Sequence, residues 1–304
     1  NLYSSVSETV KRVLEMKASV EQKLLYLPKL YSGEWVGAMC LYEVQSGANY
    51  NSLRTQAIPT PDGCYRITGT KVFVTSGDHD LCSNILYLVL ARIQGALPGE
   101  NGISMFIVPK FDLLTEKKTA ERNKVRCVKL DQKMGVHGNA TCVMNFDEAL
   151  GYLVAEPGEG ANGLRQIQFE NRLRVGLQGV VLAEKSYQCA NAYARYCMQL
   201  EHKDEAVKNS GALAIINHPD VKRMLLTQKA FSEAGRCLIY DAAKLVDQLS
   251  AYTDEGRENR QLLMFLSILS EGFLTEVGVE ASDLGVQVLG SYGILSEWGM
   301  EKNV

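Results

Sequence analysis

The chain has 304 residues, of which 46% are hydrophobic and 22% are charged, and its formal net charge at pH 7 is -3. This composition is typical of a globular protein with a sizeable core, and the length predicts two or three packed units. The nearly balanced charge excludes a broad electrostatic attraction to nucleic acid, so we expect no nucleic-acid partner.

The cysteines and histidines show no metal-site spacing. The eight cysteines form no CxxC pair, and the four histidines are widely separated along the sequence. We therefore expect no metal, and reduced thiols as in a bacterial cytoplasm or a mitochondrial matrix.

The first residues, NLYSSVSETVKRVLEMK, have the pattern of a helix interior rather than of a signal peptide, so we expect the sequence to begin inside a domain. Apolar residues recur at helical spacing through this region, and we interpret residues 1–35 as the end of an N-terminal helical domain. The core candidates are Val10, Val13, Leu14, Leu24, Leu25 and Leu30. No apolar run approaches the roughly 20 residues that span a bilayer, so we expect no membrane span.

Short strand-like runs follow from Val36 to about Pro157. Pro61-Asp62-Gly63 marks a turn before the first of them. The runs are TPDGCYRITG, KVFVTSG, NILYLVLARI, GISMFIVPKF and TCVMNF. They predict a mostly antiparallel β domain over residues 36–157.

Helical periodicity returns after Leu164. The first helix is predicted to reach about Gln199, and at about 1.5 Å per residue it would be roughly 54 Å long. Pro219 fits the first turn of a second helix, and two further apolar repeats predict two more long helices. Residues 158–304 are therefore predicted to form a helical bundle.

Two motifs have a functional and a structural interpretation. Residues 158–163, GEGANG, match the GxGxxG pattern of dinucleotide-binding folds, but the helix predicted after them is too long for a compact βαβ unit. We favour a glycine-rich turn into a helix. His137 lies in HGNAT without a nucleophile motif nearby, so we interpret this segment as a turn as well.

Six segments, taken in chain order, resemble the motifs of one protein family. They are LPKLYSGEWVGAMCLYE, YRITGTKVFVTSGDHD, GVHGNATCVMNFDEALGYLVAEPGEG, NRLRVGLQGVVLAEKSYQCANAYAR, HPDVKRMLLTQKAF and QVLGSYGILSEWGMEK. On these segments, which cover nearly the whole chain, the sequence resembles the acyl-CoA dehydrogenase family. The stretch 200–217 before HPDV is similar to that of the longer bacterial-type branch.

The resemblance implies an α+β fold with N-terminal helices over 1–35, a central antiparallel β-barrel over 36–157 and a C-terminal helical bundle over 158–304. It also implies FAD-dependent α,β-dehydrogenation of an acyl-CoA thioester, as in fatty acid β-oxidation. The implied electron acceptor is an electron-transfer flavoprotein. The implied assembly is a homo-oligomer or a pair with a paralogue.

The same resemblance assigns site residues. The segment from Met39 to Thr55 resembles a flavin and acyl-CoA binding loop. The positions that match cofactor-binding residues are Tyr42, Phe73, Thr75, Ser76, Gln287 and Gly290. Ala48 and Arg172 match positions that contact the CoA part of the substrate.

Several matched positions depart from the family pattern. Tyr42 stands for a flavin-bonding threonine, and Cys197 stands for an arginine that binds the FAD pyrophosphate. The other departures are Val44 for proline, Ala48 for serine or threonine, Asn49 for aspartate and Ser291 for glycine. Each lost charge-assisted bond to a phosphate costs about 1.5–3 kcal/mol, so weakened or lost FAD binding is one expectation.

The catalytic base is not found at the matched positions. Most relatives carry a glutamate beyond the segment that ends here at Val304, and one branch carries it at the position of Asn171. Glu170 is a weak local candidate, because one residue along a helix rotates the side chain by about 100°. Two hypotheses remain: an enzyme whose base lies beyond Val304, and a non-catalytic subunit with a structural or partner-binding role.

Overall fold

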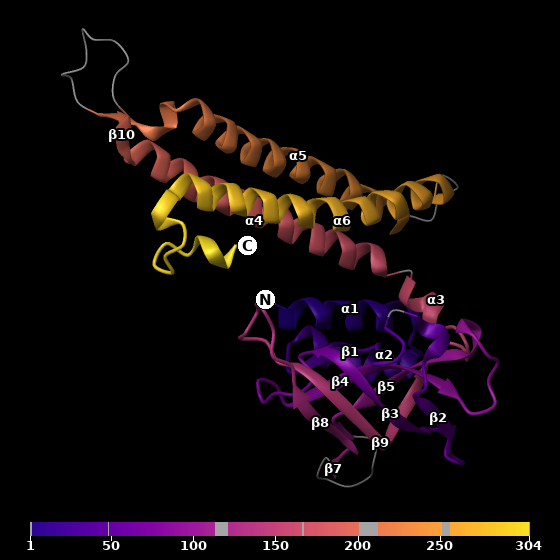
Figure 1. Cartoon of the computed structure of the whole chain (residues 1–304). Coiled ribbons are helices and arrows are strands. Elements are labelled where there is room, and N and C mark those ends of the chain that lie inside the picture. Colours follow the sequence, from indigo (N-terminus) through magenta and orange to yellow (C-terminus); the bar gives the residue numbers. More distant parts are fainter. Residues whose placement is uncertain are drawn as a thin grey trace. The chain divides into compact units, whose positions relative to one another are not determined.

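The structure is a computed structural model that describes residues 2–47, 49–112, 121–165, 167–200, 212–250 and 256–303. The chain divides into two compact units, Asn1–Ile167 and Gln168–Val304 (Figure 1). The first unit packs helices on a β-sheet, and the second is built of long helices.

Two helices open the first unit, α1 (Leu2–Lys17) and α2 (Val20–Tyr31). Ser19 begins α2 with a capping box, because its Oγ accepts the Gln22 N–H at 3.2 Å and the Gln22 side chain accepts the Ser19 N–H at 3.2 Å. Of the predicted core residues, Val10, Val13, Leu14 and Leu30 are buried and Leu25 packs against them. Leu24 is 72% exposed, so that prediction is wrong: it lies on the solvent face of α2.

The strands of the first unit, in chain order, are β1 (Trp35–Cys40), β2 (Gln56–Pro59), β3 (Tyr65–Thr75), β4 (Asn84–Ile93), β5 (Ile103–Pro109), β6 (Phe111–Asp112), β7 (Glu121–Arg122), β8 (Val125–Leu130) and β9 (Thr141–Val154). The short helix α3 (Gly160–Arg165) follows them.

The main sheet closes on itself. Pairing runs from β4 through β2, β3 and β9 to β5, and β5 pairs again with β4. A closed ring of this kind leaves none of its five strands with a free edge. Most pairings are antiparallel as predicted, but β4 pairs in parallel with both β1 and β2.

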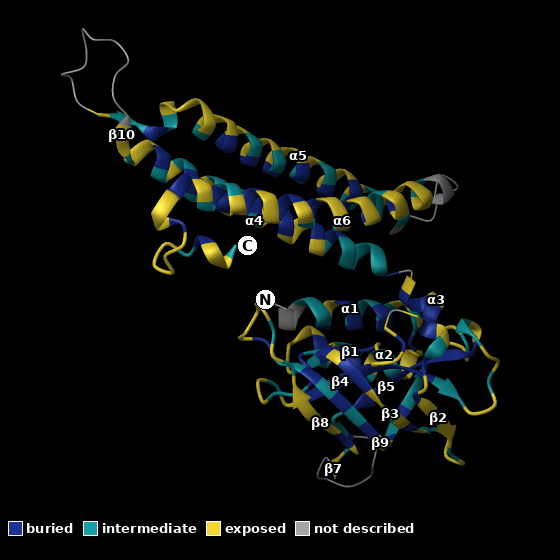
Figure 2. Cartoon of the chain, in the orientation of Figure 1, coloured by how far each residue is buried: buried dark blue, intermediate teal, exposed yellow. Residues whose placement is uncertain are grey.

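Both faces of β4 are buried, which explains its continuous apolar run (Figure 2). Leu86, Leu88 and Leu90 join the core beneath α1 and α2. Tyr87 and Val89 point the other way, into the second core together with residues of β3, β5 and β9. The alternation of side chains along a strand thus supplies two cores from one segment.

GEGANG is a packing motif rather than a dinucleotide loop. Gly158 has a φ of 86°, and a Cβ atom at Gly160 would lie 2.8 Å from the Ile103 carbonyl oxygen. The glycines therefore let the start of α3 lie directly on β5.

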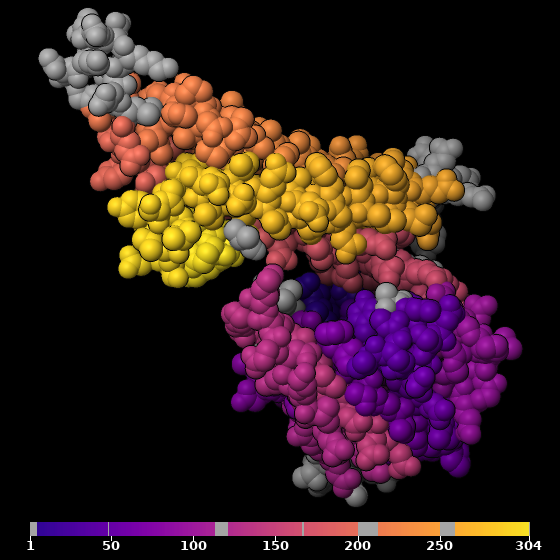
Figure 3. All heavy atoms as spheres, in the orientation of Figure 1, coloured from indigo at the N-terminus to yellow at the C-terminus, as the bar shows by residue number. Residues whose placement is uncertain are grey.

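The second unit contains α4 (Gln168–Tyr196), α5 (Pro219–Ser250) and α6 (Gly256–Leu289), with a small pairing of β10 (Met198–Leu200) and β11 (Leu213–Ala214). Figure 3 shows α5 and α6 packed side by side along much of their length. The predicted helix after Leu164 is divided, because α3 ends at Arg165 and α4 begins at Gln168.

Glycines bring α4 and α6 into close contact. A Cβ atom at Gly278 would lie 2.9 Å from the Gly179 Cα, and one at Gly179 would overlap the Leu274 carbonyl. Farther along the same two helices, the buried Gln228 side chain of α5 donates to Ser186 Oγ of α4 at 3.0 Å and to the Ala281 carbonyl of α6 at 2.7 Å.

Helix α6 is apolar on nearly all sides. By length and composition it could cross a membrane, with a mean hydropathy of 1.6 in its most apolar window, of which 33% is buried. No such segment was predicted from the sequence, because α6 carries scattered charges and contains no uninterrupted apolar run of bilayer length. The core helix of a bundle has the same composition.

The α+β fold class, with N-terminal helices, a closed central sheet and C-terminal helices, is confirmed. The division at residues 35 and 157 stays a prediction.

Candidate functional site

Phe73 is an exposed aromatic residue with a backbone conformation that residues other than glycine rarely adopt. It has a φ of 56°, and it lies where the pairing register of β3 and β9 shifts between Lys71 and Val74. Its ring is 67% exposed. A β-bulge changes the direction of a side chain, and here it directs the Phe73 ring outward. A bulky residue at positive φ is strained, so this conformation costs conformational free energy.

Tyr42 lies beside this bulge. It forms an isolated antiparallel bridge with Val72, whose N–H donates to the Tyr42 carbonyl at 3.0 Å. Its side chain is 36% exposed. The structure therefore brings together two predicted cofactor residues that are 31 positions apart in sequence.

Thr75 and Ser76 complete the same end of β3. Thr75 pairs with Thr141 of β9. Ser76 is fully buried with a φ of 59°, and its N–H donates to the Ala140 carbonyl at 2.8 Å. Its Oγ accepts a hydrogen bond from Asn139 Nδ2 at 3.4 Å. The backbone N–H of Ser76 is thus already used within the protein.

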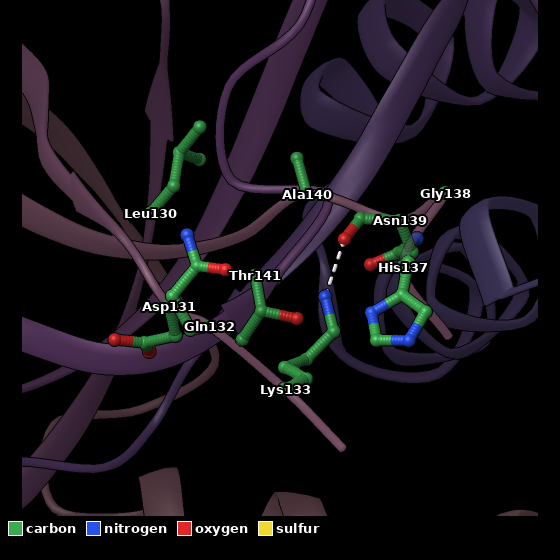
Figure 4. Close-up of a pocket in the computed structure, with 9 residues that line it drawn as sticks. All are labelled: Leu130, Asp131, Gln132, Lys133, His137, Gly138, Asn139, Ala140 and Thr141. Carbon is green, nitrogen blue, oxygen red and sulfur yellow. Dashed lines mark hydrogen bonds between the residues drawn. The ribbon is translucent and has the colours of Figure 1, made fainter. Parts of the chain in front are cut away.

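A polar pocket of about 360 Å³ lies over the turn that braces Ser76 (Figure 4). Its lining includes Asp131, Lys133, His137 and Asn139. Lys133 Nζ donates to the Asn139 carbonyl at 2.5 Å, as the dashed line in Figure 4 marks. The HGNAT segment therefore forms a turn, as predicted, and Val136, immediately before it, has a φ of 54°.

A buried ion pair lies close to Tyr42 and Phe73. Lys71 Nζ is 2.9 Å from Glu43 Oε1, and the two side chains are 0% and 4% exposed. Burial raises the pKa of Glu43, but the Lys71 ammonium and hydrogen bonds from Thr55 and Arg54 outweigh it and lower the pKa to about 2. Burial lowers the pKa of Lys71, and Glu43 opposes that shift. This pair was not predicted from the sequence.

The site residues of the second unit lie on α4 and at the end of α6. Arg172 Nε is 3.2 Å from Glu271 Oε2, so it is paired across the bundle. Glu170 Oε2 is 3.8 Å from a guanidinium nitrogen of Arg174 on the same helix. Gln287 is exposed on the last turn of α6.

Gly290 is the residue at which α6 gives way to a short 3-10 helix. It has a φ of 58° and is exposed, with no atom near the position of a Cβ. Its positive φ, rather than crowding, requires glycine here. Ser291 follows it and is exposed.

Cys197 lies just after α4 and packs against the apolar core of that end of the bundle. A hydrogen bond with Cys197 raises the pKa of Tyr193 to about 12. Tyr193 in turn packs edge-on against Trp298, with ring centroids 5.5 Å apart. An aromatic and sulfur cluster therefore surrounds the position where the family pattern has a cation.

Ala48, the predicted substrate contact, lies outside the described residues. All eight cysteines are free. Across the described ranges, no three His, Cys, Asp or Glu side chains are grouped as metal ligands. The structure thus gathers Tyr42, Phe73, Thr75 and Ser76 in one unit and Arg172, Gln287 and Gly290 in the other.

Comparison with known proteins identifies the fold family. Residues 38–149 match the model of the acyl-CoA dehydrogenase middle domain. The chain is 42% identical over 288 residues to 3-methylmercaptopropionyl-CoA dehydrogenase of Ruegeria pomeroyi, a match that covers 94% of this chain and 49% of the relative. It is 33% identical over 297 residues to butyryl-CoA dehydrogenase of Syntrophomonas wolfei, covering 94% of this chain and 48% of the relative.

A solved structure agrees with these matches. The acyl-CoA dehydrogenase of Bacillus anthracis, complexed with FAD, superposes with a TM-score of 0.75 at 25% identity, covering 94% of this chain and 47% of that one. The chain spans about half the length of the curated relatives that it matches. The closed sheet, the helical bundle and the matched sequences together show that this chain is related to the acyl-CoA dehydrogenases and that its residues 38–149 match their middle domain.

Proposed function

We propose that this protein carries out FAD-dependent α,β-dehydrogenation of an acyl-CoA thioester and passes the electrons to an electron-transfer flavoprotein. The observation that carries the proposal is the exposed side chain of Phe73, held on a strained backbone beside Tyr42 and Thr75. Strain of this kind persists where the surrounding structure enforces it, and it is typical of ligand sites.

The residues of the first unit fit a flavin ring. Phe73 offers an exposed aromatic face, and Thr75 offers a hydroxyl at the edge of the same strand end. Tyr42 offers a hydroxyl on a larger side chain at the position where the family pattern has threonine. FAD, when bound, supplies the hydride acceptor for the β-hydrogen. The second unit fits the pyrophosphate less well, because Cys197 offers no charge.

The substrate class is an acyl-CoA thioester. Arg172 is the described cation that the family pattern assigns to the CoA part, and it is held by Glu271. A phosphate that binds Arg172 would have to compete with this carboxylate. The arginine side chain is 28% exposed, so a phosphate can reach it from solvent.

Removal of the α proton requires a base, and neither position 170 nor position 171 of α4 supplies one that is free. Asn171 has no basic group, and Glu170 is held by Arg174. We propose that the base is a glutamate outside the 304 residues of this sequence. Hydrogen-bond donors to the thioester carbonyl would stabilise the enolate-like charge that forms when this base acts.

A second candidate function is a non-catalytic subunit that pairs with an active paralogue. Cys197 favours it, because a packed thiol and Tyr193 occupy the position where a pyrophosphate-binding cation is expected. In this case the barrel and bundle would serve only to bind a partner.

Absorbance spectroscopy on the purified full-length protein separates the two functions. We expect a yellow protein whose flavin absorbance bleaches on mixing with butyryl-CoA, because hydride transfer reduces the flavin. Glu170→Gln should leave the extent of bleaching unchanged, since Glu170 is not the proposed base. A folded protein that stays colourless after incubation with FAD would leave only the non-catalytic function.

Self-association through the bundle is a further part of the proposal. The exposed apolar side chains of α6 include Leu262, Phe265, Ile268 and Phe273, which are 47%, 63%, 52% and 52% exposed. Such a row is unusual on a monomer surface and is typical of an interface. Sedimentation should show a dimer or larger species at micromolar concentration, and Phe265→Glu with Phe273→Glu should shift it toward the monomer. A wild-type monomer would contradict this.

The curated relatives named above are bacterial proteins. We therefore propose that this protein acts in a bacterial cytoplasm.

A further inference from the structure

The Glu43–Lys71 pair has no role in the chemistry proposed above. Burying two charges costs free energy that their mutual attraction often fails to repay, so a buried pair contributes little to stability compared with apolar residues of the same size. Its place in the fold, beneath the loop formed by residues 44–53, suggests what it does instead. Within this loop, the structure describes all residues except position 48.

Glu43 ties both ends of this loop together. At the far end, its carboxylate accepts the N–H groups of Arg54 at 2.9 Å and Thr55 at 3.0 Å, and the Thr55 hydroxyl at 2.6 Å. At the near end, its carbonyl accepts the N–H groups of Ser46 and Gly47, both at 3.1 Å. One residue therefore fixes where the loop leaves the barrel and where it returns.

Lys71 joins this carboxylate to the strand that carries Phe73. Besides the ion pair, its Nζ donates to the Leu41 carbonyl at 3.4 Å. The next residue, Val72, forms the bridge to Tyr42. A Cβ atom at Gly69 would overlap the Thr55 hydroxyl, so glycine is needed there for Thr55 to reach Glu43.

We propose that Glu43 and Lys71 are positioning residues that clamp residues 44–47 and 49–53 against β3 and so hold Tyr42 and Phe73 in one arrangement for the ligand. The identity of the ligand as FAD rests on the proposed function, whereas the clamp rests on the contacts of the pair. Pre-organising a binding loop reduces the ordering cost of binding.

Two double variants separate the clamp from the stability of the pair. Lys71→Met with Glu43→Gln removes both charges but keeps one acceptor oxygen, which can replace Glu43 Oε1 as the acceptor of the Thr55 N–H and hydroxyl. Lys71→Met with Glu43→Leu removes both charges and the acceptor. Neither variant leaves an uncompensated buried charge, which is the usual reason that breaking such a pair unfolds a protein.

The measurements are amide hydrogen exchange of the full-length protein without FAD, and the Kd for FAD. We expect the Gln variant to keep wild-type exchange at Thr55, and the Leu variant to exchange there about fivefold faster or more while β4 and β5 stay protected. The Kd for FAD should rise only in the Leu variant.

A matched control is Lys124→Met with Glu148→Leu, which removes an ion pair of 3.2 Å whose side chains are 59% and 65% exposed. This variant should change neither measurement. Equal exchange rates at Thr55 in the Gln and Leu double variants would overturn the clamp. Faster exchange at Thr55 in the Leu variant with an unchanged Kd for FAD would overturn it as well. If the wild type binds no FAD, the proposed function fails while the exchange comparison still decides the clamp.

Discussion

Gly179→Ala is expected to lower the free energy of unfolding of the helical unit by about 2–3 kcal/mol, the cost of overpacking a close contact. A methyl group at this position would overlap the Leu274 carbonyl of α6, and backbone cannot move aside as the end of a side chain can. The gain of about 1 kcal/mol in helix propensity does not offset this overlap.

The matched control for this change is Gly272→Ala on α6, where no atom lies within 4 Å of the new methyl group. This variant should gain about 0.5–1 kcal/mol, because alanine replaces glycine in an exposed helix interior. Urea unfolding followed by Trp298 fluorescence, in a Trp35→Phe background, reports on the helical unit alone. Effects of the same sign for both variants would contradict the close α4–α6 contact.

The overall fold could be predicted from sequence where burial produces a simple pattern. Residues 84–93 form β4 as the run NILYLVLARI predicts, because both faces of this strand are buried. The long helices were also predictable, since each buries one stripe at helical spacing. Leu24 of α2 is an exception, because this apolar residue is exposed although its spacing predicted that it is buried.

The candidate site could be predicted only in part. The resemblance selected Tyr42 and Phe73, but the sequence KVFVTSG gives no sign that Phe73 adopts a positive φ at a bulge. Bulges depend on the partner strand, which is remote in sequence.

The Glu43–Lys71 pair has no local signal either, because its members are 28 residues apart. A lysine in a strand is usually on the solvent face, and Lys71 is buried only because Glu43 meets it there. One available signal was the CLYE segment, whose carboxylate lies inside the loop that the resemblance assigned to ligand binding.

Tyr42→Thr combined with Cys197→Arg is expected to strengthen FAD binding by about tenfold or more. Restoring one charge-assisted hydrogen bond of roughly 1.5 kcal/mol accounts for that factor. Tyr42 lies beside Phe73, so a smaller threonine keeps a hydroxyl and removes bulk at the position expected to face the flavin. Cys197 is only partly buried, so an arginine there can pack its stem and keep its head in solvent.

Titration calorimetry on the full-length protein measures this change, with each single variant alongside. Cys197→Gln is the matched control, because glutamine provides a polar side chain without the charge. It should recover little of the affinity if the missing interaction is with a phosphate. Tight wild-type binding that neither substitution alters would mean that other groups hold the phosphates. The departures at positions 42 and 197 would then be neutral substitutions within a working flavin site rather than signs of a weakened one.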